Sequence, residues 1–282
     1  MTSAPDPTTA ATVSSFENQE LIDLTLVLAE DLPCWWPAHM PYQQKTFNYF
    51  ADRPQDPQPL HAGAGPYQTR WLLIDEHTGT HFDAPTHFIP PPGSGLPEAG
   101  PAGELSAERV PLGQLMGPAA VIDAPADRHS ADPGASPSIE PELIVSWETE
   151  LGELRRGEIV LFRTGWDRRY RRSPAGREYV EDVLIDRSAP GWPAPTVAAM
   201  RLLLERGVRC VGTDAPTMGA AHNGVPVHVT GLSAGAVFVE GLANLAALPP
   251  RGAWFCFAPL KLEGGTGAPG RAFALVPKAG RA

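Results

Sequence analysis

The stretch HTGTHFDAPTHF, residues 77 to 88, decides how this chain is interpreted. It holds three histidines and one aspartate, although the chain of 282 residues has only 8 His. His77, His81 and Asp83 are metal-ligand types at spacings of four and two. His87 adds a titratable side chain four positions further on. The pattern therefore predicts a metal site rather than scattered surface histidines.

The local structure of this stretch is predicted to be extended. Thr78, Gly79 and Thr80 separate the first two histidines, and they are poor residues for a helix. The preceding run TRWLLIDEH (69 to 77) is aromatic and branched, as in a buried strand, and all four site side chains would then share one face. Gly79 allows a kink, and Pro85 stops the ladder. We expect the end of a strand, where these side chains would bind the metal.

These residues carry a resemblance to a known family. The run is similar to the signature HxGTHxDxPxHF of the metal-dependent cyclase/amidohydrolase family, which contains bacterial kynurenine formamidases, isatin hydrolases and enzymes called polyketide cyclases. The CWWP block and the insert PPPGSGLPEAG (90 to 100) resemble the isatin hydrolase branch more than the compact kynurenine formamidases. Further blocks that resemble the family are LPCWWPAHMPYQ (32 to 43), FRTGWD (162 to 167), VGTDAPTM (211 to 218), VEGLANL (239 to 245) and APLKLEGGTGAPGRAFALV (258 to 276).

The resemblance implies a fold and further site residues. It implies an α/β, swivelling β/β/α fold with a mixed, curved, barrel-like sheet and flanking helices. It places His228 and Glu240 at the far side of the metal centre, as ligands of the metal or of the substrate, with His222 as a competing candidate. Glu240 also follows the apolar run AVFV, and a carboxylate at the end of a buried strand needs a partner. Trp36 matches a position that lines the substrate pocket, where an indole suits a flat substrate.

The ligand set indicates catalysis. Two imidazoles and one carboxylate leave coordination positions open, and Mn²⁺ and Zn²⁺ both suit such N/O ligands. The metal would polarise a carbonyl and activate the water that attacks it. His87 is expected to act as the proton shuttle, since an imidazole can accept and return a proton near neutral pH. The chemistry expected of this site requires no Ser or Cys nucleophile.

Three functions are compatible with this site. The leading one is a metal-dependent hydrolase that opens a cyclic amide or cleaves an N-acyl (formyl) aromatic amine, with isatin-like or N-formylkynurenine-like substrates. The alternative is a polyketide-type ring cyclase that uses the same metal to stabilise an enolate. A non-catalytic metal-binding scaffold is the third, and the complete set of predicted ligands together with His87 argues against it.

Composition limits the partners and the compartment. A net charge of -10 and a pI near 5.3 argue against nucleic acid and anionic membranes. No apolar run approaches the ~20 residues of a membrane span, and the N-terminus has no signal-peptide pattern. Cys34, Cys210 and Cys256 are too widely spaced to suggest a disulfide framework. We expect a cytoplasmic protein, in which Cys34 is partly exposed and the other two cysteines lie in the core.

The rest of the chain predicts one catalytic domain, residues 18–282, after a disordered lead-in at 1–17. The Pro- and Gly-rich run 89–104 is expected to cover one side of the active site. Helices are predicted at 141–151 and from Pro195 to 206, and strands at 21–28, 119–123, 158–164, 208–214, 236–240, 253–258 and 271–276. A homodimer or higher oligomer is expected from the resemblance and from the aromatic-rich segment 35–50.

Overall fold

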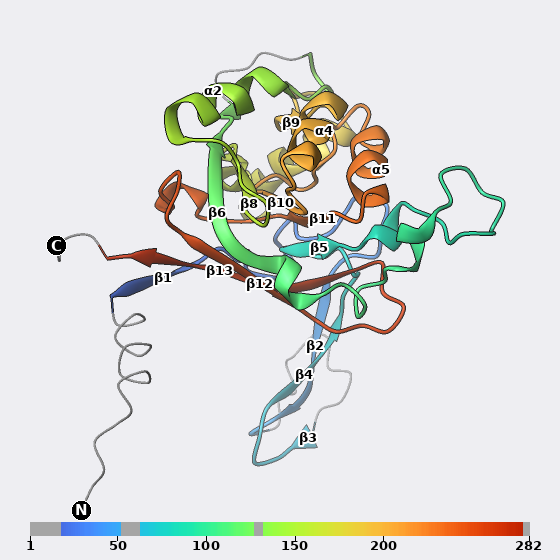
Figure 1. The fold of residues 1–282 in the computed structure, drawn as a ribbon. Coiled ribbons are helices and arrows are strands. Elements are labelled where there is room, and N and C mark those ends of the chain that lie inside the picture. The colour runs from blue at the N-terminus through green and yellow to red at the C-terminus, as the bar shows by residue number, and fades with distance from the viewer. Residues whose placement is uncertain (1–17, 52–62, 127–131, 279–282) are drawn as a thin grey trace, which may run out of the picture.

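A closed, seven-stranded mixed sheet forms the centre of the computed structural model, which describes residues 18–51, 63–126 and 132–278 (Figure 1). Its strands follow the order β13, β12, β6, β8, β10, β11 and β5, and the pairing of β5 with β13 closes the ring. The strands are β5 (His81–Asp83), β6 (Met116–Asp123), β8 (Ile159–Arg163), β10 (Cys210–Thr213), β11 (Val237–Glu240), β12 (Trp254–Pro259) and β13 (Gly267–Pro277). The predicted curved, barrel-like sheet is confirmed.

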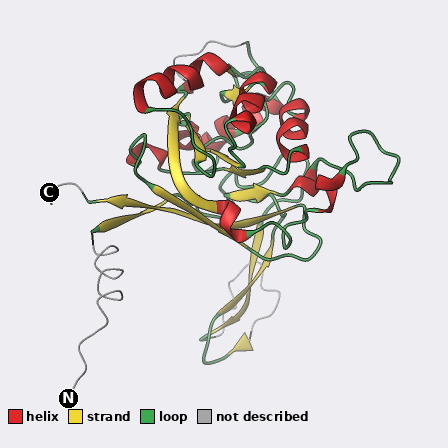
Figure 2. Ribbon diagram, viewed as in Figure 1, coloured by secondary structure: helices red, strands yellow, loops and turns green. Residues whose placement is uncertain are grey.

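Four neighbouring strands of this ring, β6, β8, β10 and β11, run parallel and are apolar without alternation because both of their faces are buried. One face contributes to a cluster that includes residues of all seven strands, such as Phe82 and Leu161, and so fills the barrel. The other face, with Phe162 and Phe238, packs against helices (Figures 1 and 2). The helices are α2 (Pro141–Leu151), α3 (Glu181–Leu184), α4 (Val197–Glu205) and α5 (Val225–Ser233).

The predicted helices are present, and one starts later than expected. The helix α2 covers the predicted range 141–151, with Pro141 in its first turn. The second helix does not begin at Pro195, which belongs to the short strand β9 (Ala194–Pro195) paired with β7 (Ser138–Ile139). Thr196 is the cap instead, because its hydroxyl accepts a hydrogen bond from Ala199 N at 3.2 Å. The helix α4 therefore starts at Val197.

An arm projects from the barrel, and it contradicts one strand prediction. It consists of β2 (Gln43–Tyr49), β3 (Gly63–Ala64) and β4 (Thr69–Leu73) (Figure 1). The run 69–77 was expected to be a buried strand, but its strand ends at Leu73 and lies on this arm. Trp71 and Leu72 are 53% and 58% exposed. The apolar side chains of β4 therefore do not belong to the core of the described chain.

Three further expectations were wrong. The strand predicted at 21–28 is short: β1 (Gln19–Asp23) ends where the Thr25 hydroxyl takes over bonding to the backbone of Ala272. Cys34 is buried, at 3% exposure, rather than partly exposed. No residue of the run 89–104 lines the pocket described below; instead, Gly103 O accepts a hydrogen bond from the Thr86 hydroxyl at 3.2 Å. Shorter helical turns are η1 (Pro85–His87), η2 (Pro101–Glu104), η3 (Leu112–Leu115), η5 (Trp166–Arg169), η6 (Ala175–Tyr179) and η7 (Leu245–Ala247).

Two expectations concern the chain as a whole. Residues 1–17, the predicted lead-in, lie outside the described residues. Within the described residues, no helix has the length and apolar character required to cross a membrane.

Candidate metal centre

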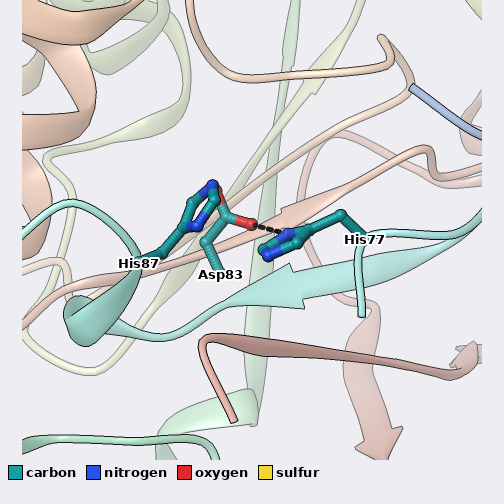
Figure 3. Close-up of side chains that lie close together, drawn as sticks. All are labelled: His77, Asp83 and His87. Carbon is teal, nitrogen blue, oxygen red and sulfur yellow. Dashed lines mark hydrogen bonds and ion pairs between the residues drawn. The ribbon is translucent and has the colours of Figure 1, made fainter. Parts of the chain in front are cut away.

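Three local structures, rather than one strand, present the motif residues. His77 lies in a turn, where its backbone N donates to Asp75 Oδ1 at 2.8 Å. Gly79 then takes a left-handed conformation, φ 63°, which gives the expected kink. The strand β5 carries His81 and Asp83, and η1 follows it. The prediction that all four side chains share one strand face is therefore wrong, although the fold still brings them together, and Figure 3 shows three of them, His77, Asp83 and His87.

The strand β5 lies between β11 and β13, and its register with β11 gathers the buried acids. Glu240 pairs with His81 across the antiparallel ladder, and Phe238 pairs with Asp83. Since alternate residues of a strand share a face, Asp83 and Glu240 lie on the face that Phe238 presents to the helices. The helix α5 packs on this face and adds His228. The site thus forms between the outer face of the barrel and α5.

The five predicted metal or substrate ligands converge on the two carboxylates. His77 Nδ1 lies 2.9 Å from Asp83 Oδ1, as Figure 3 shows. His81 Nε2 lies 3.6 Å from Asp83 Oδ1 and 3.4 Å from Glu240 Oε2. His228 Nε2 lies 3.6 Å from Asp83 Oδ2 and 3.4 Å from Glu240 Oε1. The structure therefore brings His228 to the site rather than His222, whose Nδ1 accepts a hydrogen bond from Ser136 N at 3.1 Å.

Backbone carbonyls orient two of these histidines. His81 Nδ1 donates to Gly79 O at 2.9 Å, and His228 Nδ1 donates to Gly224 O at 2.8 Å. Each bond places a ring proton on the outer nitrogen, so that Nε2 faces the carboxylates and becomes the lone-pair nitrogen once a metal ion displaces its proton. Metal-ligating histidines commonly have this arrangement.

The donor set fits a divalent cation. Asp83 Oδ2 is buried and has no hydrogen-bond partner, although a carboxylate oxygen in such a place requires one. Two groups could hold an ion, with ligand atoms within 4.8 Å of one another: His77, Asp83 and His87, and His81, Asp83 and Glu240. Imidazole nitrogens and carboxylate oxygens suit Mn²⁺ and Zn²⁺ alike.

Neighbouring charges and burial shift the pKa values of the site residues in opposite directions. Burial would lower the pKa of His81, but Glu240 and Asp83 outweigh it and raise this pKa to about 9. Burial would likewise raise the pKa of Asp83, whereas the surrounding histidines hold it well below its usual range. For His87, burial dominates and lowers the pKa to about 4. A cation near Asp83 and Glu240 would take the place of the protons that the histidines otherwise carry.

A pocket of about 350 Å³ opens onto these residues. Trp36 lines it, as predicted from the resemblance, and meets Trp192 edge to face at a centroid distance of 6.4 Å. His87 also lines it and stacks on His77, with ring centroids 4.0 Å apart. Further walls come from Phe88, Pro216, Ala220, Ala221 and Val225. The pocket is therefore mainly apolar, with the polar groups gathered at one place.

Sequence reasoning missed three residues of the site. Trp192 forms an aromatic wall, and its place between Gly191 and Pro193 gave no periodic signal. Thr217 Oγ1 lies 3.3 Å from His228 Nε2, and it stands in the block VGTDAPTM that was quoted without a role. His39 lines the pocket and pairs with Asp75 at 3.3 Å. A chemical reading of the quoted blocks would have found Thr217 and His39.

Comparison with known proteins assigns the family. The model of the Cyclase family, described as "Putative cyclase", matches residues 22–220. The chain belongs to this family. An isatin hydrolase of Roseibium aggregatum is 39% identical over 214 residues, which are 74% of this cyclase-family chain and 75% of the relative. A kynurenine formamidase of Salinibacter ruber is 31% identical over 240 residues, which are 84% and 89% of the two chains.

Solved structures of similar proteins have the same fold. An isatin hydrolase bound to the product analogue thioisatinate superposes with a TM-score of 0.75 at 27% identity, covering 98% of this cyclase-family chain and 100% of the other. A predicted metal-dependent hydrolase from Bacillus stearothermophilus gives a TM-score of 0.60 at 25% identity, covering 91% and 98%. The α/β fold that the resemblance implied is thus confirmed.

Proposed function

We propose that this protein is a metal-dependent amidohydrolase, which opens a cyclic amide or cleaves an N-acyl (formyl) aromatic amine. The observation that carries the proposal is a cluster of histidines around two buried carboxylates at one place in an apolar pocket. The names of the relatives, isatin hydrolase and kynurenine formamidase, support the substrate class. We propose Mn²⁺ or Zn²⁺ as the cofactor.

His77, His81 and Asp83 would hold the ion. Glu240 and His228 would bind the ion from its opposite side or orient the substrate. Bound there, a divalent cation supplies Lewis-acid polarisation of a carbonyl and activation of a water. Glu240 is itself held, because its Oε1 accepts a hydrogen bond from Met218 N at 2.7 Å.

His87 is proposed as the proton carrier. Its lowered pKa, about 4, leaves the imidazole neutral near pH 7, so it can take a proton from an attacking water. The turn η1 places the ring beside His77 and at the wall of the pocket rather than in the row of β5 (Figure 3). The same imidazole could then return the proton to the leaving nitrogen.

Trp36 and Trp192 would select the shape of the substrate. Two indoles that meet edge to face leave flat surfaces suited to a planar ring. The volume of about 350 Å³ is at the lower end of the range of small-molecule pockets. A bicyclic aromatic amide of the isatin type therefore fits the proposal.

The test is a screen of Mn²⁺- and Zn²⁺-loaded protein against isatin and N-formylkynurenine, followed by absorbance. We expect ring opening or deformylation of at least one substrate by the wild type and loss of that activity in Asp83→Ala. Metal-loaded protein that hydrolyses neither compound, yet closes the ring of a linear polyketide-type substrate, would replace the hydrolase with the alternative cyclase.

A further inference from the structure

The outer nitrogen of His77 contacts a side chain, whereas those of His81 and His228 contact backbone carbonyls. His77 Nε2 lies 3.1 Å from Thr266 Oγ1. The same hydroxyl donates to Glu76 Oε2 at 2.6 Å, and Thr266 N also donates to that oxygen at 2.9 Å. A hydroxyl has one proton to give, and an ionised carboxylate can only accept. Thr266 Oγ1 must therefore accept from His77 Nε2, which carries the ring proton.

The proton on Nε2 makes Nδ1 the ring nitrogen of His77 that can bind a metal ion. With its proton on Nε2, neutral His77 presents a lone pair at Nδ1, 2.9 Å from Asp83 Oδ1. Two lone-pair atoms that face each other at this distance need a cation between them, which is a second ring proton in the metal-free protein or the metal ion that displaces it. The hydrogen bonds from Glu76 through Thr266 thus orient His77 so that Nδ1 can act as the metal ligand.

We propose that Glu76 and Thr266 are positioning residues that fix the tautomer and the orientation of His77 and strengthen it as a metal ligand. The inference rests on the proposed binding of a metal by His77. The negative charge of Glu76, two hydrogen bonds away from the imidazole through the Thr266 hydroxyl, would draw the Nε2 proton outward and increase the basicity of Nδ1.

The glycines around Thr266 explain how it comes so close. The segment GGTGAPG (264 to 270) suggested no role in the sequence, and it leads into β13. A Cβ on Gly267 would lie 2.7 Å from His77 Cε1 and 2.4 Å from Phe82 O, and a Cβ on Gly265 would lie 3.1 Å from Glu76 Oε1. Glycine at both positions lets the threonine reach between these two side chains. Thr266 O also accepts a hydrogen bond from Ala84 N at 2.9 Å, and this bond links Thr266 to the end of β5.

The test compares zinc affinity, measured by competition with a chromophoric chelator, in wild type, Thr266→Val, Thr266→Ser and Glu76→Gln. Valine keeps the shape and removes the hydroxyl, so we expect affinity to fall by ~10 to 100-fold, the usual effect of losing an outer partner of a ligand. Serine keeps the hydroxyl and should restore most of the affinity. Glu76→Gln removes the charge and should give a smaller loss. Thr149→Val, on the exposed face of α2, is the matched control and should bind zinc like the wild type.

The outcomes separate this inference from the proposed function. If the wild type binds no zinc, the metal centre itself is wrong. If the wild type binds zinc and Thr266→Val binds it equally well, or if serine fails to rescue, the positioning role is wrong and the centre stands. Should Thr266→Val not fold, ¹⁵N spectra of zinc-loaded wild type decide the question. They should show His77 protonated at Nε2 and bound through Nδ1, and the reverse assignment would overturn the inference.

Discussion

Asp83 is shared by both groups of side chains that could hold an ion, and its Oδ2 atom is buried without a hydrogen-bond partner. Replacement by asparagine keeps its size but removes the charge that offsets a cation. We predict that Asp83→Asn loses most of its bound Mn²⁺ or Zn²⁺ in elemental analysis. Asp123→Asn, at an exposed carboxylate that pairs with Arg163, should keep the wild-type content. A full equivalent of metal in Asp83→Asn would refute the assignment.

The role of His87 distinguishes an enzyme from a protein that only binds a metal. If it carries the proton, His87→Ala should lower turnover by ~100 to 10,000-fold while the metal content stays near that of the wild type. Because His87 also belongs to one of the two candidate ligand groups, both quantities must be measured on the same sample. A parallel loss of metal would make it a ligand, and an unchanged rate would remove it from the mechanism.

The raised pKa of His81 predicts how stability and zinc affinity depend on pH. Its folded pKa of about 9 is above the ordinary value of 6.5. Protonated His81 therefore stabilises the metal-free protein fully below about pH 6.5, and this contribution is lost as the pH rises to about 9. A ligand must lose its proton, so zinc affinity should increase over the same range. Thermal unfolding in chelator and zinc competition between pH 6 and 9 measure the two trends, and flat curves would contradict the charge balance described for the site.

At the scale of elements, the kink before β5 is predicted to control stability. Gly79 has φ 63°, and a Cβ there would lie 2.4 Å from Leu28 Cδ2, whereas Gly93 has φ 81° with nothing within 4 Å of the added atom. The left-handed conformation alone costs about 1 to 2 kcal/mol for a non-glycine residue. Gly79→Ala should therefore lower the free energy of unfolding by more than Gly93→Ala does, as chemical denaturation would show. Equal losses would mean that the contact with Leu28 is unimportant.

The sequence predicted which side chains lie together better than it predicted the elements that carry them. The spacing of His77, His81 and Asp83 indicates a ligand set whatever the backbone does, and the structure brings these three side chains together. Placing them on one strand failed, because strand β4 ends at Leu73 and the kink at Gly79 separates His77 from β5. Periodicity describes one segment at a time, and these breaks depend on packing against distant parts of the chain.

The approach of Glu240 to the motif required the tertiary structure for a similar reason. Its pairing with His81 joins strands more than 150 positions apart, for which local sequence has no signal. The resemblance supplied Glu240 and His228, and the strand end at AVFV gave only the first of them a physical reason. The role of Thr266 was hidden as well, since the glycines beside it carry meaning only once His77 and Glu76 are in place.

At the scale of the whole molecule, we propose that the arm mediates self-association. Trp71, Leu72 and Leu73 of β4 are between 45% and 58% exposed, and because they are consecutive, both faces of the strand are exposed. A monomer would leave this apolar arm in water, whereas a second copy would cover it. We predict a mass above 30.1 kDa by light scattering at micromolar concentration.

The double variant Trp71→Ser/Leu72→Ser should shift the protein toward the monomer. Leu96→Ser, at a residue 58% exposed in the loop 89–104, is the control and should leave the mass unchanged. A wild type that runs as a monomer at all concentrations would sink the proposal.

The central claim is that a divalent cation held by His77, His81 and Asp83 makes this chain a hydrolase of aromatic amides. The most direct measurement is reconstitution: chelator-stripped protein is titrated with Mn²⁺ or Zn²⁺ while isatin hydrolysis and bound metal are followed together. We predict no activity without metal and a rate that rises in proportion to the metal bound, with neither in Asp83→Asn. Full activity in stripped protein, or metal that binds fully without any hydrolysis of the aromatic amides tested, would contradict the account.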